Sequence, residues 1–591
     1  MINVTEDRLN YSELLHPPEG YRVEFAVANT YSLDLETLIG FPIALNMSAE
    51  MNKTVLNDPL SIIEGIRQSS ERLAVFCQGG QMLNSGRENR SIFGLLEDNV
   101  FEVNLEDQQK SFHPKIWLIK FVNEANESRY RLIVLSRNMT FDRSWDMAVA
   151  LEGKRTEQNA GPDTEPLINL LTFLKSSISS HPKSQAIQSI IEELPYIEFD
   201  AEDKHIKDMN FLPLGIETNQ SEVGELFSYY HQMLIVSPFL SKSMLEKLMK
   251  LKLTDENMKN ILITRRTELS ELPSNAFDHF DVYVIKETII DGEEMISEGL
   301  ELPDLQEIHA KLYVKRKYNI FNFYVGSANC SNNAFHGNVE FLLNFQYKRW
   351  GFKFDELIEE LLGEDHKFQP FEKVEEIPVQ EEVETPIKDR LADEVRRLSN
   401  LHSQATVTAT ENQYELLIEF DDFVPHFDMT ISPLLSKASA QLKEKVTFHQ
   451  LDLLELGEFY LVRVESGGER VERIIKIDTF GIPPNRNQKI YQHLIKDSNY
   501  FLQYISYLLA DDFLLTSLED KHLSGLENDF QSKQDYIPVI YEKMLRTAYY
   551  SPEKLADIEE IMNLIERESV VPETFLNVYS TFQQVIEDVT K

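Results

Sequence analysis

The chain is poor in cysteine, in basic residues and in long apolar runs. Its 591 residues include only two cysteines, Cys77 and Cys330, which excludes a multi-cysteine zinc site and is not the pattern of a secreted disulfide framework. No stretch approaches the roughly 18 uninterrupted apolar residues of a membrane-spanning helix. The N-terminal residues lack the basic start and apolar run of a signal peptide. We therefore expect a soluble, cytoplasmic protein.

Basic residues are strongly outnumbered, with 58 Lys and Arg against 98 Asp and Glu and a net charge of −40. An acidic surface repels phosphate backbones and anionic membranes at long range. A nucleic-acid or lipid substrate would therefore need a local basic cleft or a partner that delivers it. Net charge averages over the whole surface, however, and does not report on a buried site.

Short apolar runs alternate with helical spacing along the first two thirds of the chain, which predicts an α/β fold. The runs at 116–119, 132–135 and 233–240 have the continuous apolar pattern of buried strands. The expected organisation is two α/β units of similar plan, a strand-rich α+β domain and a helical C-terminal domain. The expected boundaries are 1–195 and 196–363 for the two units, 364–400 for an acidic linker, 401–486 for the strand-rich domain and 487–591 for the helical domain.

Two segments carry the same pattern of polar residues. Residues 112–119 read Phe-His-Pro-Lys-Ile-Trp-Leu-Ile, and Ser-Arg-Asn follows at 136–138. Residues 308–314 read Ile-His-Ala-Lys-Leu-Tyr-Val, and Ser-Ala-Asn follows at 327–329. Each copy is expected to have His-x-Lys opening one strand and Ser-x-Asn closing the next. A single copy would arise often by chance, whereas two copies in equivalent places of two units indicate a shared site.

The spacing within each copy has a chemical consequence. His and Lys two residues apart on a strand project to the same face, and Asn at the end of the neighbouring strand reaches the same place. Two such half-sites provide two imidazoles and two fixed cations. Phosphodiester cleavage needs a nucleophile, a proton donor for the leaving oxygen and positive charge on the non-bridging oxygens. The lysines and amides supply that charge, so we expect no metal and no cofactor.

The duplicated pattern resembles the phospholipase D superfamily, over roughly residues 20–350. The superfamily's Asp after the Lys is missing, since Lys120 and Arg316 stand near its place. In this respect the chain is similar to the tyrosyl-DNA phosphodiesterase branch, whose motifs are His, Lys and Asn. The resemblance implies two phospholipase D-like α-β-α units packed as a pseudo-dimer, and it says nothing about residues 390–591.

The resemblance also implies roles for individual residues. One histidine attacks phosphorus and the other protonates the leaving group, with His113 interpreted as the nucleophile and His309 as the acid. Glu340 would orient a histidine, and Asp146 or Glu152 would do so in the first copy. The expected catalytic residues are His113, Lys115, Asn138, His309, Lys311, Asn329 and Glu340. Substrate contacts are expected at Ser136, Ser327 and Arg265.

Three functions remain open from the sequence. The first is a nuclease acting on nucleic acid, with DNA preferred, in DNA restriction or anti-phage defence; a helicase is one partner that would suit such a role, and self-association is compatible with it. The second is a phospholipase D-type lipid hydrolase or transferase, which the absence of an amphipathic basic helix disfavours. The third is a non-catalytic nucleic-acid-binding subunit, although such a protein would usually have lost a motif His or Lys.

Overall fold

The fold is described from a computed structural model. It describes residues 11–46, 59–84, 91–140, 144–157, 162–201, 203–216, 223–253, 260–286, 289–290, 293–294, 307–348, 352–362, 370–376, 387–495, 497–509, 536–550, 554–565 and 570–590. The chain is α/β, as the sequence predicts. No helix within these ranges is long and apolar enough to cross a membrane.

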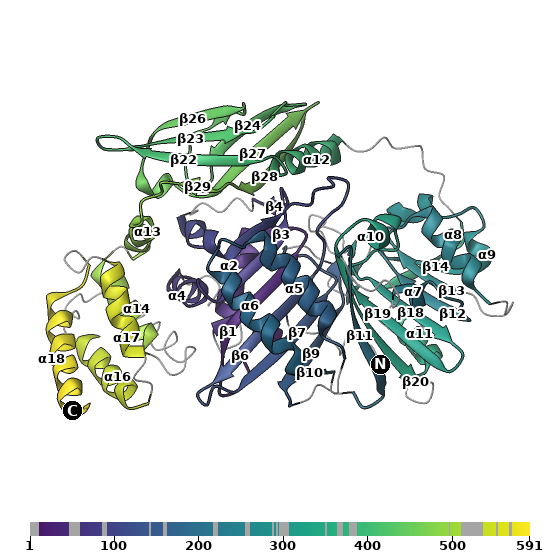
Figure 1. Cartoon of the computed structure of the whole chain (residues 1–591), viewed down its shortest axis with the longest axis horizontal. Coiled ribbons are helices and arrows are strands. Elements are labelled where there is room, and N and C mark those ends of the chain that lie inside the picture. Colours follow the sequence, from purple (N-terminus) through teal and green to yellow (C-terminus); the bar gives the residue numbers. More distant parts are fainter. Residues whose placement is uncertain are drawn as a thin grey trace.

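The first large sheet lies between two helical layers (Figure 1). Its strands are, in order, β10 (Ile197–Asp200), β9 (Ala148–Arg155), β7 (Ser128–Leu135), β6 (Ile116–Asn123), β1 (Tyr21–Thr30), β3 (Leu73–Gln78) and β5 (Val100–Val103). One face packs on α2 (Leu35–Asn46) and α4 (Pro59–Ser69), and the other on α5 (Glu165–Ser177) and α6 (Lys183–Glu193). The continuous apolar run of β6 is buried along almost its whole length because both faces are covered.

Short elements complete this part of the chain. They are α1 (Tyr11–Leu15), η1 (Ser91–Leu95), η2 (Glu97–Asn99) and η3 (Leu194–Tyr196).

The second large sheet repeats the pairing pattern of the first. Its strands are, in order, β11 (Ile206–Leu214), β20 (Glu340–Lys348), β19 (Ile320–Gly326), β18 (Leu312–Lys317), β12 (Gln232–Val236), β13 (Asn260–Thr264), β14 (Phe280–Ile285) and β21 (Phe371–Val374). β12 pairs in parallel with β13 and antiparallel with β18, just as β1 pairs with β3 and β6. Strands β6 and β18, each of which follows a His-x-Lys segment, therefore hold equivalent places.

Helices and short strands surround this second sheet. They are α7 (Val223–Leu226), α8 (Lys242–Leu251), η4 (Arg266–Glu271), α9 (Ala276–His279), α10 (Asn332–His336), α11 (Phe354–Leu362), and the pairs β15 (Ile289–Ile290) with β16 (Glu293–Glu294) and β8 (Ser144–Trp145) with β17 (Glu307–Ile308).

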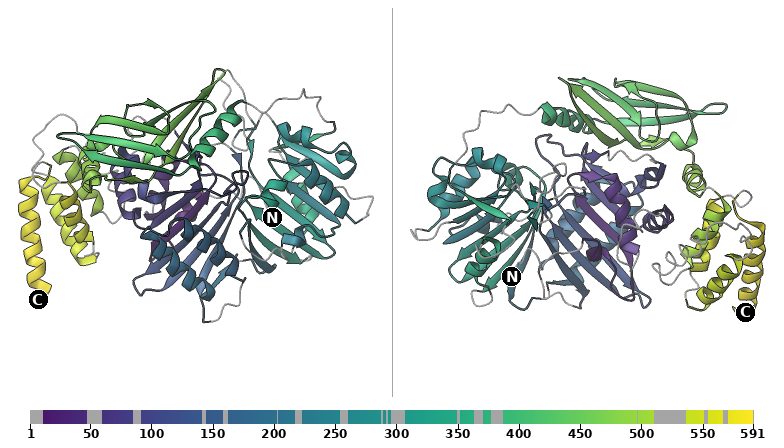
Figure 2. Two further views of the ribbon diagram at one scale, coloured as in Figure 1. Left: turned by 45° about the horizontal axis from the view of Figure 1, so that its top comes forward. Right: turned by 180° about the vertical axis from the view of Figure 1, so that it is seen from behind.

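Two further sheets form the strand-rich part, which lies over one end of the first sheet (Figures 1 and 2). One sheet contains β2 (Leu33–Asp34), β4 (Met82–Leu83), β28 (Glu469–Lys476), β27 (Phe459–Ser466), β24 (Asp428–Pro433) and β25 (Ala440–Gln441). The other contains β26 (Lys445–Leu451), β23 (Tyr414–Phe420), β22 (Ser403–Ala409) and β29 (Thr479–Phe480), with η5 (Leu453–Glu455) nearby in the chain. Because β2 and β4 come from the N-terminal part, the first of these sheets joins distant segments of the chain.

The range 364–400, expected to be a linker, contains regular structure. Residues 371–374 form β21 at the edge of the second sheet, where they pair with β14. Residues 387–399 form helix α12 (Ile387–Ser399), which buries Leu391, Val395 and Leu398 in the core of the strand-rich part. This apolar spacing of three and four residues is typical of an amphipathic helix, and the surrounding acidic residues hid it in the sequence. The acidic stretch 377–386 lies outside the described residues.

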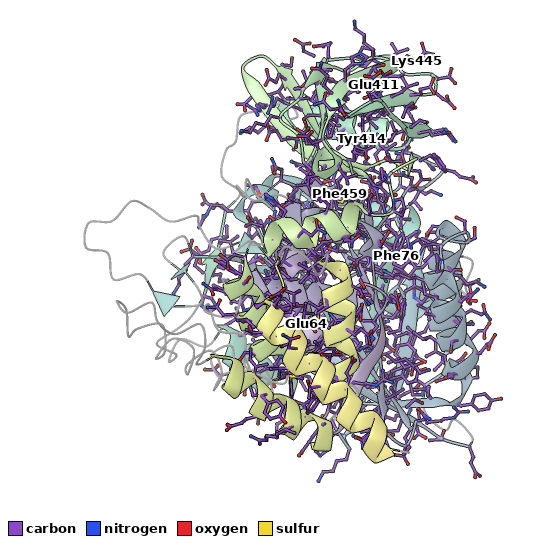
Figure 3. The ribbon with its side chains drawn as sticks, turned by 90° about the vertical axis from the view of Figure 1, so that its left-hand side faces the viewer. Glu64, Phe76, Glu411, Tyr414, Lys445 and Phe459 are labelled. Atoms are coloured by element: carbon purple, nitrogen blue, oxygen red, sulfur yellow. The ribbon has the colours of Figure 1, made fainter. Side chains whose placement is uncertain are left out.

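The C-terminal helices pack against the N-terminal part of the chain. They are α13 (Arg486–Leu494), α14 (Ser498–Leu508), α16 (Tyr536–Tyr550), α17 (Lys554–Leu564) and α18 (Glu573–Thr590). Figure 3 shows Glu64 of α4 behind these helices and Phe459 of β27 between the strand-rich part and the first sheet. The Tyr504 hydroxyl donates to Glu64, and the Arg486 guanidinium lies 2.6 Å from Glu97. Buried polar bonds thus attach the C-terminal helices to α4 and η2 beside the first sheet.

Candidate active site

The two His-x-Lys segments are brought together by bonds that cross from each motif copy to the other. The His113 backbone N–H donates to the Val339 carbonyl over 2.8 Å, and Phe112 pairs with Val339 as an isolated bridge. In the other direction the His309 N–H donates to the Trp145 carbonyl over 3.0 Å, and Ile308 pairs with Trp145. Each histidine is therefore held by the segment that follows the Ser-x-Asn of the other copy.

The expectation that His-x-Lys opens a strand needs a correction. β6 begins at Ile116 and β18 begins at Leu312, so both His-x-Lys segments lie immediately before their strands. The backbone at the two histidines pairs across the two copies, while the Lys115 carbonyl still accepts from Leu135 of its own sheet. His113 and Lys115 still face the same place, since the Lys115 Nζ lies 3.0 Å from the His113 Nε2.

In the second copy, Ser327 fixes the position of Glu340. The Ser327 N–H donates to the Phe341 carbonyl, and the Phe341 N–H donates back to the Ser327 Oγ, each over 2.9 Å. The Ser327 hydroxyl donates to Glu340 Oε2 over 2.5 Å. The Glu340 carboxylate is fully buried and accepts from His113 Nδ1 at 2.8 Å and from the Asn338 amide at 3.3 Å. Glu340 therefore orients the histidine of the first copy.

The first copy contains the same arrangement around Asp146. Ser136 donates its N–H to the Met147 carbonyl over 3.0 Å, and Met147 donates back to the Ser136 Oγ over 2.8 Å. The Ser136 hydroxyl donates to Asp146 over 3.1 Å. Asp146 thus holds the place in this copy that Glu340 holds in the other. Glu152, the sequence-based alternative, instead pairs with Arg131 at 2.5 Å and does not belong to this arrangement.

The direct substrate contacts predicted for Ser136 and Ser327 do not fit this geometry. Both serines are fully buried, and both hydroxyls are bonded to carboxylates. They position Asp146 and Glu340 instead of facing a substrate. No local pattern indicates this role, because the serine and its carboxylate are 10 residues apart in one copy and 13 in the other.

His113 is an uncharged imidazole at neutral pH. Burial lowers its pKa to about 4, and the charges of Lys115 and Lys311 act in the same direction, against the opposing effect of Glu340. Because a carboxylate accepts from Nδ1, the proton of the neutral ring belongs on Nδ1 and the lone pair on Nε2. That lone pair is on the atom nearest the Lys115 ammonium. Neutrality and a fixed tautomer are what an attacking imidazole requires.

The two motif lysines form a buried pair of cations. Lys115 and Lys311 are 2% and 4% exposed. Burial lowers the pKa of Lys115 well below its usual range, and the nearby charge of Lys311 lowers it further, while Glu340 and Asp146 act against this. The Lys115 Nζ donates to the His113 carbonyl and the Lys311 Nζ to the His309 carbonyl. Like charges held together in this way favour an anion between them.

Asn138 and Asn329 complete the two copies. Each is two residues beyond its serine, and the side-chain oxygen of each is buried. Within the described ranges neither oxygen finds a hydrogen-bond partner. The following residues are held in place, since Met139 N–H donates to Thr30 Oγ1 and Cys330 N–H to Ser237 Oγ. Buried polar groups without a partner are costly in a folded protein, so these two oxygens are suited to accept a hydrogen bond from a donor group of a ligand.

Arg265 lies beside the second histidine. Its Nε donates to the carbonyl of Ile308 over 3.1 Å, one residue before His309. Its guanidinium lies 4.6 Å from the centre of the Phe239 ring, which is 46% exposed. The substrate contact predicted for Arg265 therefore agrees with its position at the margin of the site, and it stays a prediction.

Tyr31 is a neighbour of the site that sequence reasoning missed. It follows β1 directly, and its ring centre lies 5.0 Å from that of His113. A single tyrosine after a strand belongs to no recognisable pattern, and 82 residues separate it from the histidine. The contact arises because β1 and β6 are antiparallel, which places the end of β1 beside the start of β6.

The lowered pKa of His113 predicts a loss of stability in acid. Above pH 6.5 the imidazole is neutral in both the folded and unfolded states. As the pH falls toward 4, the unfolded chain takes up a proton that the folded chain does not, which lowers the free energy of unfolding by about 3 kcal/mol. Between pH 7 and 4, the free energy of unfolding measured with urea should therefore fall by about 3 kcal/mol less in His113→Gln than in the wild type. The exposed His402→Gln is the control, and equal losses in His113→Gln and wild type would contradict the assignment.

Comparison with known proteins finds a family model similar to the second copy. Residues 220–360 match the model of the NgoFVII restriction endonuclease N-terminal PLD domain. No curated protein sequence matches the chain. The matched segment includes His309, Lys311, Asn329 and Glu340, while the first copy lies outside it.

Several solved structures resemble the chain at low sequence identity. A yeast tyrosyl-DNA phosphodiesterase has 12% identity, covers 58% of this chain and 86% of its own, and gives a TM-score of 0.36. A phosphatidylserine synthase from Haemophilus influenzae Rd KW20 has 10% identity, with 66% and 88% covered and a TM-score of 0.33. A polyphosphate kinase from Porphyromonas gingivalis has 12% identity, with 57% and 41% covered and a TM-score of 0.30.

These TM-scores are all below 0.5, so the assignment rests on the family match and on the motif residues. The match confirms the resemblance that the second His-x-Lys and Ser-x-Asn suggested. Residues 220–360 of this chain are similar to a phospholipase D-type domain, and the segment is called by that name below.

Proposed function

We propose that the protein is a metal-independent phosphodiesterase that cleaves nucleic acid through a phosphohistidine intermediate. The observation that supports this most is the meeting of two His-x-Lys segments, with Glu340 of one copy bonded to His113 of the other. Two imidazoles, two buried ammonium groups and two buried amides then surround one place. This set provides a nucleophile, an acid and fixed positive charge without further components.

In the first step, His113 Nε2 attacks the phosphorus of the diester. A P–N bond forms, the P–O bond to the leaving oxygen breaks, and His309 gives its proton to that oxygen. Lys115 and Lys311 stabilise the negative charge on the non-bridging oxygens. Glu340 accepts the Nδ1–H of His113 and stabilises the positive charge that develops on the ring, as the carboxylate of a catalytic triad does.

In the second step, His309 is unprotonated and acts as a base. It takes a proton from a water molecule, whose oxygen attacks phosphorus as the P–N bond breaks. His113 is released as a neutral ring, and His309 is again protonated for the next cycle. Asp146 is the residue we propose to support His309, because it occupies the place equivalent to that of Glu340.

Nucleic acid is the proposed substrate class, with DNA preferred. The matched family is named for a restriction endonuclease, which supports a nuclease role in DNA restriction or defence. The net charge of −40 opposes unspecific binding of a long polyanion. We therefore propose that binding depends on local cations around the site or on a partner protein, rather than on the surface as a whole.

The substrate class can be tested by incubating the purified full chain with single-stranded DNA, double-stranded DNA, RNA and phosphatidylcholine vesicles in EDTA. We expect cleavage of at least one nucleic acid at an unchanged rate in EDTA, and none by His113→Ala. Loss of all cleavage in EDTA, with recovery on adding Mg²⁺, would contradict the metal-independent mechanism. Hydrolysis of the lipid alone would agree with the proposed mechanism but would contradict nucleic acid as the substrate class.

A further inference from the structure

The strand-rich part of the chain lies against the loops that carry the catalytic residues. Ile474 of β28 pairs with Met82 of β4, and β4 pairs with β2. Leu33 of β2 in turn bridges Met139, the neighbour of Asn138. A continuous series of backbone pairings therefore links β28 to one of the two site asparagines.

Helix α12 makes the closest approach to this region. The guanidinium of Arg396 donates to the Lys110 carbonyl, three residues before His113. Gly80, at the end of β3, has a φ of +71°, and a Cβ at this position would lie 2.9 Å from the Arg396 Cα. Only glycine combines this backbone conformation with such a close contact. Glycine at position 80 thus allows α12 to pack directly against the end of β3.

Two arginines from these elements act electrostatically on Tyr31. Burial raises the pKa of the Tyr31 hydroxyl, and the charges of Arg396 and Arg473 oppose that rise, whereas Asp393 adds to it. The ring of Tyr31 lies against His113, at 5.0 Å between centres. Arg396 belongs to α12 and Arg473 to β28, so both cations come from the part of the chain that follows the phospholipase D-type domain.

Both guanidinium groups have N–H groups without a hydrogen-bond partner among the residues that the structure describes. Arg473 donates from one terminal nitrogen to the Glu472 carbonyl, and Arg396 donates to Lys110. The Nε of each is buried, and among the residues that the structure describes neither Nε has a hydrogen-bond partner. A guanidinium with unused N–H groups is well suited to bind the oxygens of a phosphate.

A cavity of about 440 Å³ adjoins Arg396. α12 supplies Arg390, Asp393 and Arg397 to its lining, and the loop before His113 supplies Gln108 and Gln109. Arg397 is paired with Glu394 at 2.6 Å. The α12 wall of the cavity therefore carries three arginines against two carboxylates, and the facing loop contributes two amides, in a chain whose overall charge is strongly negative.

We propose that Arg396 and Arg473 bind a phosphate of the nucleic-acid strand next to the one that is cleaved, and that the strand leaves the active site past Tyr31 toward this cavity. The strand-rich part would then complete the substrate site. This inference rests on the proposed nuclease function and adds a location for the flanking nucleotides. It also gives a local source of positive charge that the acidic surface cannot supply.

The test compares a polymer with a small diester. The full chain, Arg473→Gln and Arg396→Gln are assayed on a fluorescent single-stranded oligonucleotide and on bis(p-nitrophenyl) phosphate, which has no flanking phosphate. Arg470→Gln, on the same strand but with an exposed side chain, is the matched control. Thermal melting checks that each variant is folded, and Arg473→Lys tests whether a cation alone suffices.

We expect Arg473→Gln and Arg396→Gln to lower kcat/KM for the oligonucleotide about tenfold each, with diester hydrolysis unchanged. The slope of log affinity against log salt should fall by about one for each variant. Unchanged oligonucleotide cleavage, or an equal loss on both substrates, would overturn the proposed phosphate site while leaving the nuclease function intact. Diester hydrolysis without any oligonucleotide cleavage by the wild type would refute the nuclease function, and the inference with it.

Discussion

His113→Ala and His309→Ala should both abolish nucleic-acid cleavage but should differ on a substrate with a good leaving group. Removing the nucleophile should lower kcat by about 10⁴-fold or more on every substrate. Removing the acid should lower kcat by about 10²- to 10⁴-fold, and only for substrates whose leaving oxygen needs a proton. A p-nitrophenolate needs none, so His309→Ala should cleave the p-nitrophenyl ester of a nucleotide in the first step at close to the wild-type rate.

The structural reason for this asymmetry is the environment of His113. Its Nδ1–H is held by the buried Glu340, and its pKa of about 4 keeps the ring neutral at neutral pH. The measurement is the first-turnover burst of p-nitrophenolate by each variant, with His402→Ala as a surface control. A burst in His113→Ala and none in His309→Ala would exchange the two roles and contradict our assignment.

Lys115→Met should remove activity and at the same time stabilise the protein. Lys115 is buried, and its pKa is lowered by burial and by Lys311. An apolar side chain of similar length avoids both the cost of burying the ammonium and its repulsion from Lys311. The free energy of unfolding should therefore rise by about 1–3 kcal/mol. Loss of a cation that stabilises the reacting phosphate should lower kcat by about 10²- to 10³-fold.

A neighbouring lysine provides the matched control. Lys120 of β6 is equally buried but is paired with Glu24 at 3.0 Å and with Glu193 at 2.8 Å. Lys120→Met should therefore lower stability by about 1 kcal/mol and leave activity unchanged. Urea unfolding followed by tryptophan fluorescence suits both variants, because Trp117 is buried at the start of β6. Destabilisation of both by the same amount would show that Lys115 is not under electrostatic strain.

The sequence predicts the local parts of the site because they depend on short spacings. His113 and Lys115, or His309 and Lys311, face one place whenever the chain is extended. The strands that follow them are continuous apolar runs that only a doubly covered sheet accommodates. The residues proposed for chemistry could therefore be identified before their arrangement in space was known.

The contacts that cross between the copies could not be predicted in this way. Glu340 is 227 residues from His113, and no local pattern indicates which of the two histidines it contacts. The choice between Asp146 and Glu152 was also open, since both precede or lie within the same apolar strand. The bond of the Ser136 hydroxyl to Asp146 favours Asp146, because Glu152 pairs with Arg131 instead.

The region after the phospholipase D-type domain was the least predictable. Its acidic composition obscured the apolar spacing of α12, and its arginines belong to no motif. Tyr31, Arg396 and Arg473 come from three distant segments that meet only because β28 pairs with β4. A contribution of this region to the substrate site is visible only in three dimensions.

The most direct test of the two-histidine account is to trap the intermediate. His309→Ala is mixed with the p-nitrophenyl ester of thymidine monophosphate in EDTA, quenched in alkali, in which phosphohistidine survives, and digested for mass spectrometry. Without His309 to activate water, the second step should be slow, so we predict a thymidylyl group on the peptide that contains His113. A burst of p-nitrophenolate with no modified His113 peptide, or modification of a different residue, would contradict the account.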